Sequence, residues 1–124
     1  MKILEIAFTG YTVTDVKRAR AFYEGVLGLE TSRIWGEEPA PDWIEYDIGS
    51  GCLAIVKGDG KLWQPSPHGT AAAFEVDDFQ AFVDKIKAAN VKIVMDVYES
   101  PVCWMLTIAD PDDNRLVIHK RKNR

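Results

Sequence analysis

The chain has 124 residues, of which 47% are hydrophobic, and a formal net charge of −4. This length allows one hydrophobic core, and no apolar run approaches the roughly 18 residues of a membrane span, so we expect no membrane contact. The acidic balance argues against nucleic acid as a partner, and the one basic cluster, Lys120-Arg121-Lys122 with Arg124, is expected to be a solvated terminal tail.

The first half of the chain predicts a strand, a helix and three further strands. Residues 3–13 alternate and are rich in Ile, Phe, Thr and Tyr, which is typical of a strand. Asp15 is placed to cap a helix that ends at Gly28, a residue that tolerates the left-handed conformation. Its apolar stripe is Val16, Ala19, Phe22, Tyr23 and Val26. The following strands are expected at 31–36, 43–48 and 52–57.

The second half predicts the same order after a linker at 58–67, which is rich in Gly, Pro and Ser. A strand at 70–76 leads to a helix capped by Asp78, and Asn90 can take the left-handed conformation at its end. The helical stripe is Phe79, Phe82, Val83 and Ile86. The remaining strands are expected at 91–95, 103–109 and 115–120.

The two halves therefore repeat each other with an offset of about 60 residues. Val13-Thr14-Asp15 and Val76-Asp77-Asp78 open the two predicted helices, and the run of residues that begins at Trp43 is echoed by the run that begins at Trp104. Two copies are too few for a solenoid. The sequence predicts an α+β fold of two βαβββ modules, about 1–60 and about 66–122, within a single domain spanning 1–124.

The start of the chain and its two cysteines bear on the compartment. The run after Met1-Lys2 is too short and too polar for a secretory signal, so we expect a cytoplasmic location. Cys52 and Cys103 do not form a CxxC pair and indicate free thiols in a reducing compartment rather than a disulfide framework.

Two motifs carry a resemblance to a known family. They are Val-x-Asp leading to Arg-Ala-x-Ala-Phe-Tyr-x-x-Val-Leu-Gly, from Val13 to Gly28, and Asp110-Pro111-Asp112-Asp113-Asn114 before the last strand. The chain resembles the vicinal oxygen chelate superfamily of glyoxalases, extradiol dioxygenases, methylmalonyl-CoA epimerases, and bleomycin- and fosfomycin-resistance proteins. The resemblance covers essentially the whole chain. It implies a curved, open barrel around a cavity, usually completed by a homodimer.

The resemblance also implies where a divalent metal would be bound. By motif alignment, the family's ligand positions fall on Phe8, Ala54, Ala71 and Val117. All four side chains are apolar and offer no lone pair to a metal that needs three or four ligands. We therefore expect no metal and no other cofactor at this position.

An acid–base site without metal is one alternative. By strand parity Glu75 shares a face with Ala71, and Arg115 and His119 share a face with Val117. A Glu, a His and an Arg at one end of a cavity could transfer protons, because the imidazole titrates near neutrality. The competing interpretation is that Glu75 and Arg115 are solvated or paired strand-end residues and that His119 is a frayed terminal residue.

The tryptophans and other aromatic side chains indicate a ligand-binding surface. Trp43 and Trp104 are expected at equivalent positions in the two modules, and Trp35 and Trp63 lie near strand ends and the linker. Aromatic walls bind planar or apolar ligands. The candidate ligand-binding set is Phe8, Trp35, Trp43, Trp63, Trp104 and His119. Packing in the core or at a dimer interface is the alternative role for the tryptophans.

Three functions remain open. The first is a binding protein of the bleomycin-resistance type, which sequesters a bulky aromatic or cationic compound without metal or turnover. The second is an enzyme with a relocated or metal-free site acting on a small oxygenated metabolite. The third is a metal-dependent glyoxalase or dioxygenase, which the four apolar residues oppose. We favour them in that order, with a small-molecule ligand as the expected partner.

Overall fold

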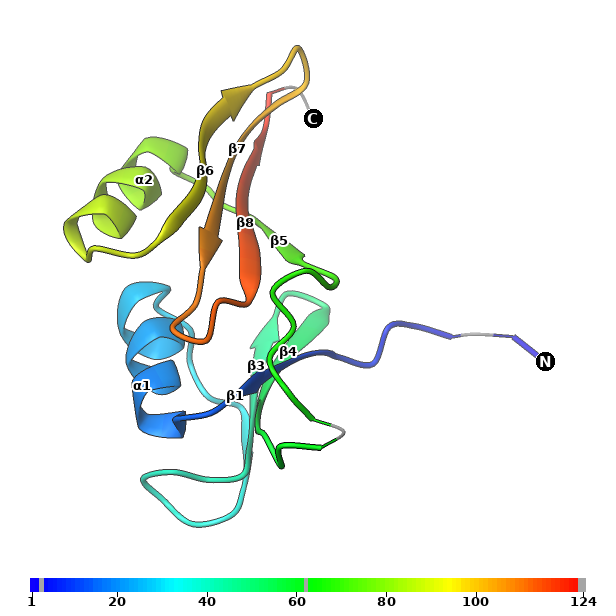
Figure 1. Cartoon of the computed structure of the whole chain (residues 1–124). Helices are drawn as coiled ribbons and strands as arrows, with labels where there is room; N and C mark the ends of the chain where they lie inside the picture. The colour runs from blue at the N-terminus through cyan, green and yellow to red at the C-terminus, as the bar shows by residue number, and fades with distance from the viewer. Residues whose placement is uncertain (3, 62, 123–124) are drawn as a thin grey trace. The chain divides into compact units, whose positions relative to one another are not determined.

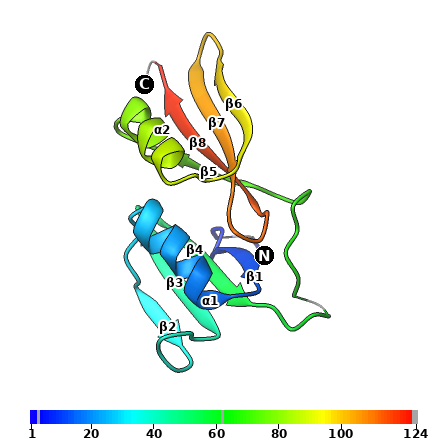
Figure 2. The ribbon, with the colours of Figure 1, turned by 60° about the vertical axis from the view of Figure 1, so that its left-hand side comes forward.

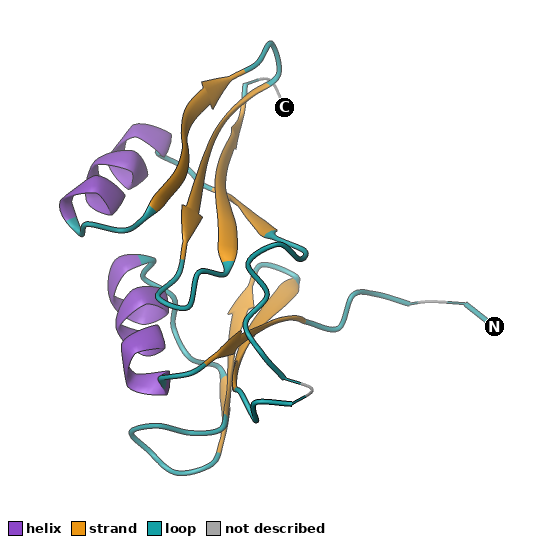
Figure 3. Cartoon of the chain, viewed as in Figure 1, coloured by secondary structure: helices purple, strands orange, loops and turns teal. Residues whose placement is uncertain are grey.

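The computed structural model describes residues 1–2, 4–61 and 63–122. The chain divides into two compact units, Met1–Pro65 and Ser66–Arg124, and the boundary between them in the sequence falls inside the predicted linker. Each unit holds one helical segment and one four-stranded sheet, in the predicted order βαβββ. Figure 3 shows each helix against a single sheet. The prediction of an α+β fold built from two βαβββ modules is confirmed.

The sheet of the first unit has the order β1-β4-β3-β2. The strands are β1 (Thr9–Val13), β2 (Arg33–Trp35), β3 (Trp43–Ile48) and β4 (Gly51–Lys57). β1 pairs in parallel with β4, and the other neighbours are antiparallel. The sheet does not close on itself, so β1 and β2 are its edges, as an open barrel requires.

The second sheet repeats this topology with the order β5-β8-β7-β6. Its strands are β5 (Ala72–Glu75), β6 (Ile93–Glu99), β7 (Cys103–Ala109) and β8 (Arg115–Arg121). β5 pairs in parallel with β8, as β1 does with β4. In Figure 2, α2 (Phe79–Ala88) lies across one face of this sheet.

The helices begin and end where the sequence predicts. The Asp15 and Asp78 side chains accept hydrogen bonds from the Arg18 and Ala81 N–H groups, both at 3.1 Å. Gly28 and Asn90, beyond the helix ends, have φ of 73° and 55°. The first helix changes character along its length: α1 (Val16–Arg20) continues as the π-helix η1 (Ala21–Val26). Among the described residues, no helix is long and apolar enough to cross a membrane.

Each sheet buries the face that its helix covers. In the first unit Tyr23 of η1 is fully buried and lies 6.3 Å from the ring of Tyr46 on β3. Tyr11, Ile44, Leu53 and Ile55 complete this layer. Burying such a side chain contributes about 1.5–3 kcal/mol, so this layer accounts for much of the unit's stability.

Several predicted strand limits are wrong. The first strand begins at Thr9, which pairs with Leu53, rather than at residue 3. By this parallel register the start of β4 at Gly51 corresponds to Ala7, so residues before Ala7 have no strand beside them; residue 3 lies outside the described residues. Figure 1 shows this segment extending away from β1. The strand predicted at 91–95 runs instead from Ile93 to Glu99, with two irregularities in its pairing with β7.

Candidate functional site

The face of the first sheet opposite α1 carries a row of alternating side chains. Because side chains alternate along a strand, Trp43, Glu45 and Asp47 of β3 share this face with Arg33 and Trp35 of β2. We call it the open face of the first unit. β4 and β1 add smaller side chains to it, namely Cys52, Ala54, Val56, Gly10 and Thr12.

Aromatic rings gather at one end of this open face. Trp43 makes edge-to-face contacts with Phe8 at 5.1 Å and with Trp63 at 6.3 Å, within the usual range for aromatic pairs. Trp35 is directly opposite Trp43 in the strand pairing. A shallow pocket of about 380 Å³ is lined by Trp35, Trp43 and Glu45, and we call it the tryptophan pocket. The Trp35 side chain is 52% exposed, so it presents apolar surface to a ligand.

Charged groups are fixed beside the tryptophan pocket. One oxygen of Glu45 accepts from Arg33 Nε at 2.5 Å, and the other accepts from Trp43 Nε1 at 2.9 Å. Arg33 also contacts the Asp47 carboxylate at 2.6 Å. The hydrogen bond from Arg33, followed by that from Trp43, lowers the pKa of Glu45 below its usual value. The carboxylate is therefore ionised at neutral pH and orients the Trp43 indole.

The loop that joins the two pocket tryptophans is anchored to the helix. Arg20 contacts Glu38 and the Pro39 carbonyl oxygen, at 2.7 and 3.0 Å. The same guanidinium contacts Glu24, which accepts a hydrogen bond from the buried Tyr46 hydroxyl at 2.8 Å. Gly36 is required where the loop begins, since a Cβ there would lie 2.7 Å from the Asp42 nitrogen. The Arg20 contacts and the glycine at position 36 thus both constrain the loop between Trp35 and Trp43.

The fourth predicted tryptophan, Trp104, does not match Trp43. Trp43 pairs with Val56 in the first sheet, and Met105 pairs with His119 in the second. Because Val56 and His119 hold equivalent places in the two sheets, Met105 is the counterpart of Trp43. Trp104 is therefore one residue out of step and lies on the helix side of its sheet. The prediction that the two tryptophans are equivalent is wrong because a shift of one residue changes the face of a strand.

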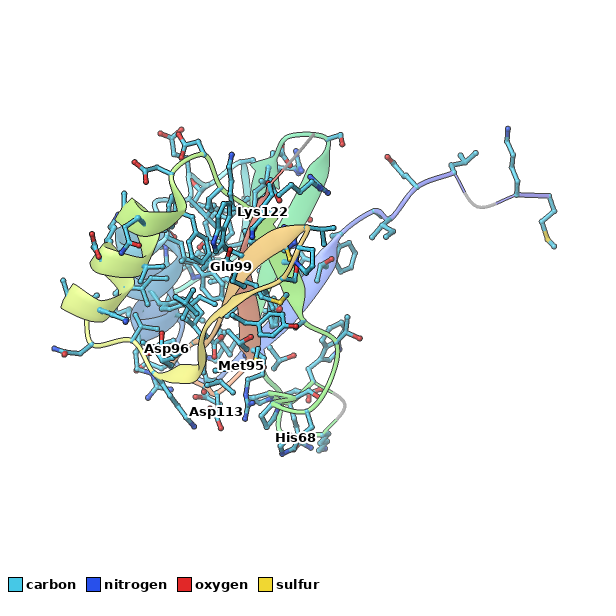
Figure 4. The ribbon with its side chains drawn as sticks, turned by 90° about the horizontal axis from the view of Figure 1, so that it is seen from above. His68, Met95, Asp96, Glu99, Asp113 and Lys122 are labelled. Carbon is cyan, nitrogen blue, oxygen red and sulfur yellow. The ribbon has the colours of Figure 1, made fainter. Side chains whose placement is uncertain are left out.

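Trp104 has other neighbours. The Lys122 ammonium lies 4.7 Å from its ring centroid and pairs with Glu99, and Figure 4 shows the labelled Lys122 and Glu99 close together. A shallow pocket of about 410 Å³ here is lined by Phe79, Gln80, Val97, Glu99, Trp104 and Lys120. This pocket faces α2 and belongs to a different surface from the open face.

The positions where the family holds its metal do not fit one here. Ala54 lies opposite Gly10 in the first sheet, and Val117 lies opposite Ala73 in the second, so the register supports their equivalence. Phe8 and Ala71 each lie two residues before these partners. All four side chains lack a ligand atom. Within the described residues, no group of three or more His, Cys, Asp or Glu side chains could hold a metal ion.

The structure brings together two of the three predicted acid–base residues. His119 Nδ1 lies 2.7 Å from Glu75 Oε1, and the two residues are register partners on β8 and β5. Arg115 shares their face but is four residues from His119, about 13 Å along an extended strand. The alternative of one cluster of three residues is therefore not found, because strand length separates Arg115 from the pair.

Sequence reasoning missed three residues at the tryptophan pocket, namely Glu45, which lines it, and Arg33 and Asp47 beside it. Arg33 and Asp47 were not predicted as site residues, although they complete the charges around Glu45. Alternation in the predicted strands at 31–36 and 43–48 could have placed both on the face that carries Trp35 and Trp43. What the sequence lacked was the antiparallel register that sets Arg33 opposite Glu45.

Comparisons with known proteins support one family. The model of the Glyoxalase/Bleomycin resistance protein/Dioxygenase superfamily matches residues 5–118. Comparison with curated protein sequences gives no significant match.

Solved structures with the same fold include three bacterial proteins. Lactoylglutathione lyase from Agrobacterium tumefaciens is 18% identical, with a TM-score of 0.72 over 96% of this chain and 95% of that one. A glyoxalase family protein from Bacillus anthracis is 18% identical, with a TM-score of 0.78 over 98% of both chains. The fosfomycin resistance protein FosX from Mesorhizobium loti is 16% identical, with a TM-score of 0.69 over 96% and 93%. The chain belongs to the Glyoxalase/Bleomycin resistance protein/Dioxygenase superfamily.

Proposed function

We propose that this protein is a metal-independent binding protein for a planar small molecule, of the bleomycin-resistance type, with the tryptophan pocket as its site. The observation that carries the proposal is the pocket itself, in which Trp35 and Trp43 flank Glu45. An exposed indole beside a fixed carboxylate stacks on an aromatic ligand while the carboxylate attracts a positive or hydrogen-donating group.

The charges of the open face favour a cation. Glu45 and Asp47 share one guanidinium, that of Arg33, so one negative charge is left uncompensated near the pocket. The pocket is shallow and its nearest charged groups are partly exposed, so this charge steers ligands rather than supplying most of the affinity. The proposed ligand is therefore planar, largely apolar and positively charged.

A titration with two dyes tests this ligand class. Proflavine, a planar cation, should quench tryptophan fluorescence and bind more tightly than anthracene-2-sulfonate, a planar three-ring anion of comparable apolar area. The preference should weaken as salt is added, because exposed charges are screened. Equal affinities, or tighter binding of the anion, would contradict the proposed ligand class.

We also propose that the protein works as a homodimer. Each sheet has two edge strands, each with one side unpaired. In the extended segment before β1, Leu4 is 82% exposed and Ile6 is 81% exposed. Exposed edges and apolar side chains are normally covered, and a second identical chain is the simplest cover. Sedimentation velocity at micromolar concentration should give about twice the 13.9 kDa mass of one chain. A monomer under these conditions would exclude the proposal.

A further inference from the structure

We propose that Glu75 and His119 form a second site, on the other unit, that accepts a proton from the hydroxyl group of a phenol-like ligand. This inference does not rest on the tryptophan pocket, since the two sites share no residue. The site lies on the open face of the second sheet, opposite α2, where Glu75 ends β5 and His119 is its register partner on β8.

The geometry orients the imidazole. Glu75 Oε1 lies 2.7 Å from His119 Nδ1, and Glu75 Oε2 accepts the Arg121 backbone N–H at 2.8 Å. Both carboxylate oxygens are engaged, so the carboxylate is held in place. Because an ionised carboxylate only accepts hydrogen bonds, a neutral His119 imidazole carries its hydrogen on Nδ1, and Nε2 is the acceptor. Among the described residues, Nε2 has no hydrogen-bond partner, and the His119 side chain is 22% exposed.

The repeat shows that the fold does not require this pair. Counting from the helix caps, Glu75 lies three residues before Asp78, as Thr12 does before Asp15. Thr12 is the register partner of Val56 in the first sheet, which is the place that Glu75 and His119 hold in the second. One module thus builds the same strand pair from a threonine and a valine. The His–Glu pair is an addition of the second module, which points to a role other than packing.

The surroundings suit an aromatic ring with a hydroxyl group. Met105 lies directly across from His119 on β7, and Val117 shares the same face two residues along β8. A methionine sulfur and an aliphatic side chain pack well against an aromatic ring. A ring lying over them would direct its hydroxyl group to Nε2. The other titratable groups on this face are Arg121, whose Nη1 is 3.6 Å from Glu75 Oε1, and Tyr98, which is the register partner of Met105 on β6. Arg115 and Cys103 lie farther along the strands.

The proton transfer is simple and reversible. The ligand O–H bond breaks, its electron pair stays on the oxygen, and the proton binds Nε2. The resulting imidazolium is neutralised by the Glu75 carboxylate. The hydrogen bond from the Arg121 N–H, followed by that from His119, lowers the pKa of Glu75. Transfer of the proton onward to the carboxylate is therefore disfavoured.

A coloured phenol tests the site directly. 4-Nitrophenol absorbs visible light only as the phenolate, so its ionisation can be followed while it is titrated with protein. When bound, it should ionise at a lower pH than in solution, by about one pKa unit, a tenfold change in its ionisation constant. The double variant Glu75→Thr with His119→Val copies the pair that the first module already accommodates, and it should abolish the shift.

Three controls make the result decisive. His68→Gln removes the only other histidine and should keep the shift, and Trp43→Ala should keep it even if it abolishes dye binding in the first unit. His119→Gln should lose the shift and serves if the double variant does not fold, as judged by circular dichroism. A shift that survives in either His119 variant, or no shift in the unmodified protein, would overturn the proposal. If the unmodified protein shows the shift but does not bind proflavine, only the proposed function is refuted.

Discussion

Replacing Asp110 by alanine should lower the free energy of unfolding by about 3 kcal/mol. The Asp110 carboxylate is 4% exposed and accepts three hydrogen bonds, from the Asp112 N–H and from the backbone and side-chain N–H groups of Asn114, each at 2.9 Å. Asn114 is 1% exposed, and its side-chain oxygen accepts the Ser66 N–H at 3.0 Å. Alanine would leave buried donors without an acceptor, which costs more than the hydrogen bonds themselves. Urea unfolding followed by circular dichroism measures the change.

Asp113 gives a matched control within the same turn, and Figure 4 labels it. Its carboxylate is exposed and pairs with Lys92 at 2.8 Å, a contact typically worth less than about 1 kcal/mol. Asp113→Asn keeps a residue that tolerates the φ of 70° found there, so only the charge is removed. Equal losses for Asp110→Ala and Asp113→Asn would refute the view that this motif stabilises the turn through buried hydrogen bonds.

Replacing Trp43 by alanine should weaken proflavine binding by about 1–3 kcal/mol, roughly 5- to 150-fold. Trp43 lines the tryptophan pocket, and its ring also contacts Phe8 and Trp63, so its removal takes away stacking area and loosens the aromatic cluster. Some stability should be lost as well, because the side chain is half-buried. Fluorescence titration of the folded variant, following the dye rather than the protein, measures the affinity.

Trp104→Ala is the matched control for this prediction. It removes the same kind of side chain from a β-strand of the second unit, on the face toward α2, next to Phe79 and Lys120. Its affinity for proflavine should stay within a factor of about two of the unmodified protein, although its melting temperature should fall. If Trp104→Ala weakens binding and Trp43→Ala does not, the ligand site has been assigned to the wrong unit.

The repeated pattern was sufficient to predict the fold class. Helix caps at Asp15 and Asp78, a left-handed residue after each helix, and alternating strands are all local signals. The caps and the left-handed residues are found where they were expected, and each predicted strand forms, with different limits in several cases. The extent of the first strand depended instead on where β4 begins, which is set by pairing between distant residues. Local pattern therefore predicted which elements form but not how far each one extends.

The candidate site depended on register, which the sequence does not encode locally. A match of tryptophan with tryptophan made Trp43 and Trp104 appear equivalent, whereas the strand pairing makes Met105 the counterpart of Trp43. In contrast, the parity argument for Glu75 and His119 needed only the face of each strand, and the two side chains are in contact. Alternation within each predicted strand placed this pair correctly, whereas matching the two halves by residue type placed Trp104 on the wrong face.

Binding without metal is the central claim, and dye titration of metal-stripped protein tests it most directly. Protein dialysed against a chelator, with metal content checked by elemental analysis, should bind proflavine with the same affinity before and after zinc, nickel, manganese or iron(II) is added. The reason is that Phe8, Ala54, Ala71 and Val117 offer no ligand atom, and neighbouring residues cannot replace missing ligands. One tightly held metal ion per chain, with dye affinity lost on its removal and restored on its return, would contradict the account.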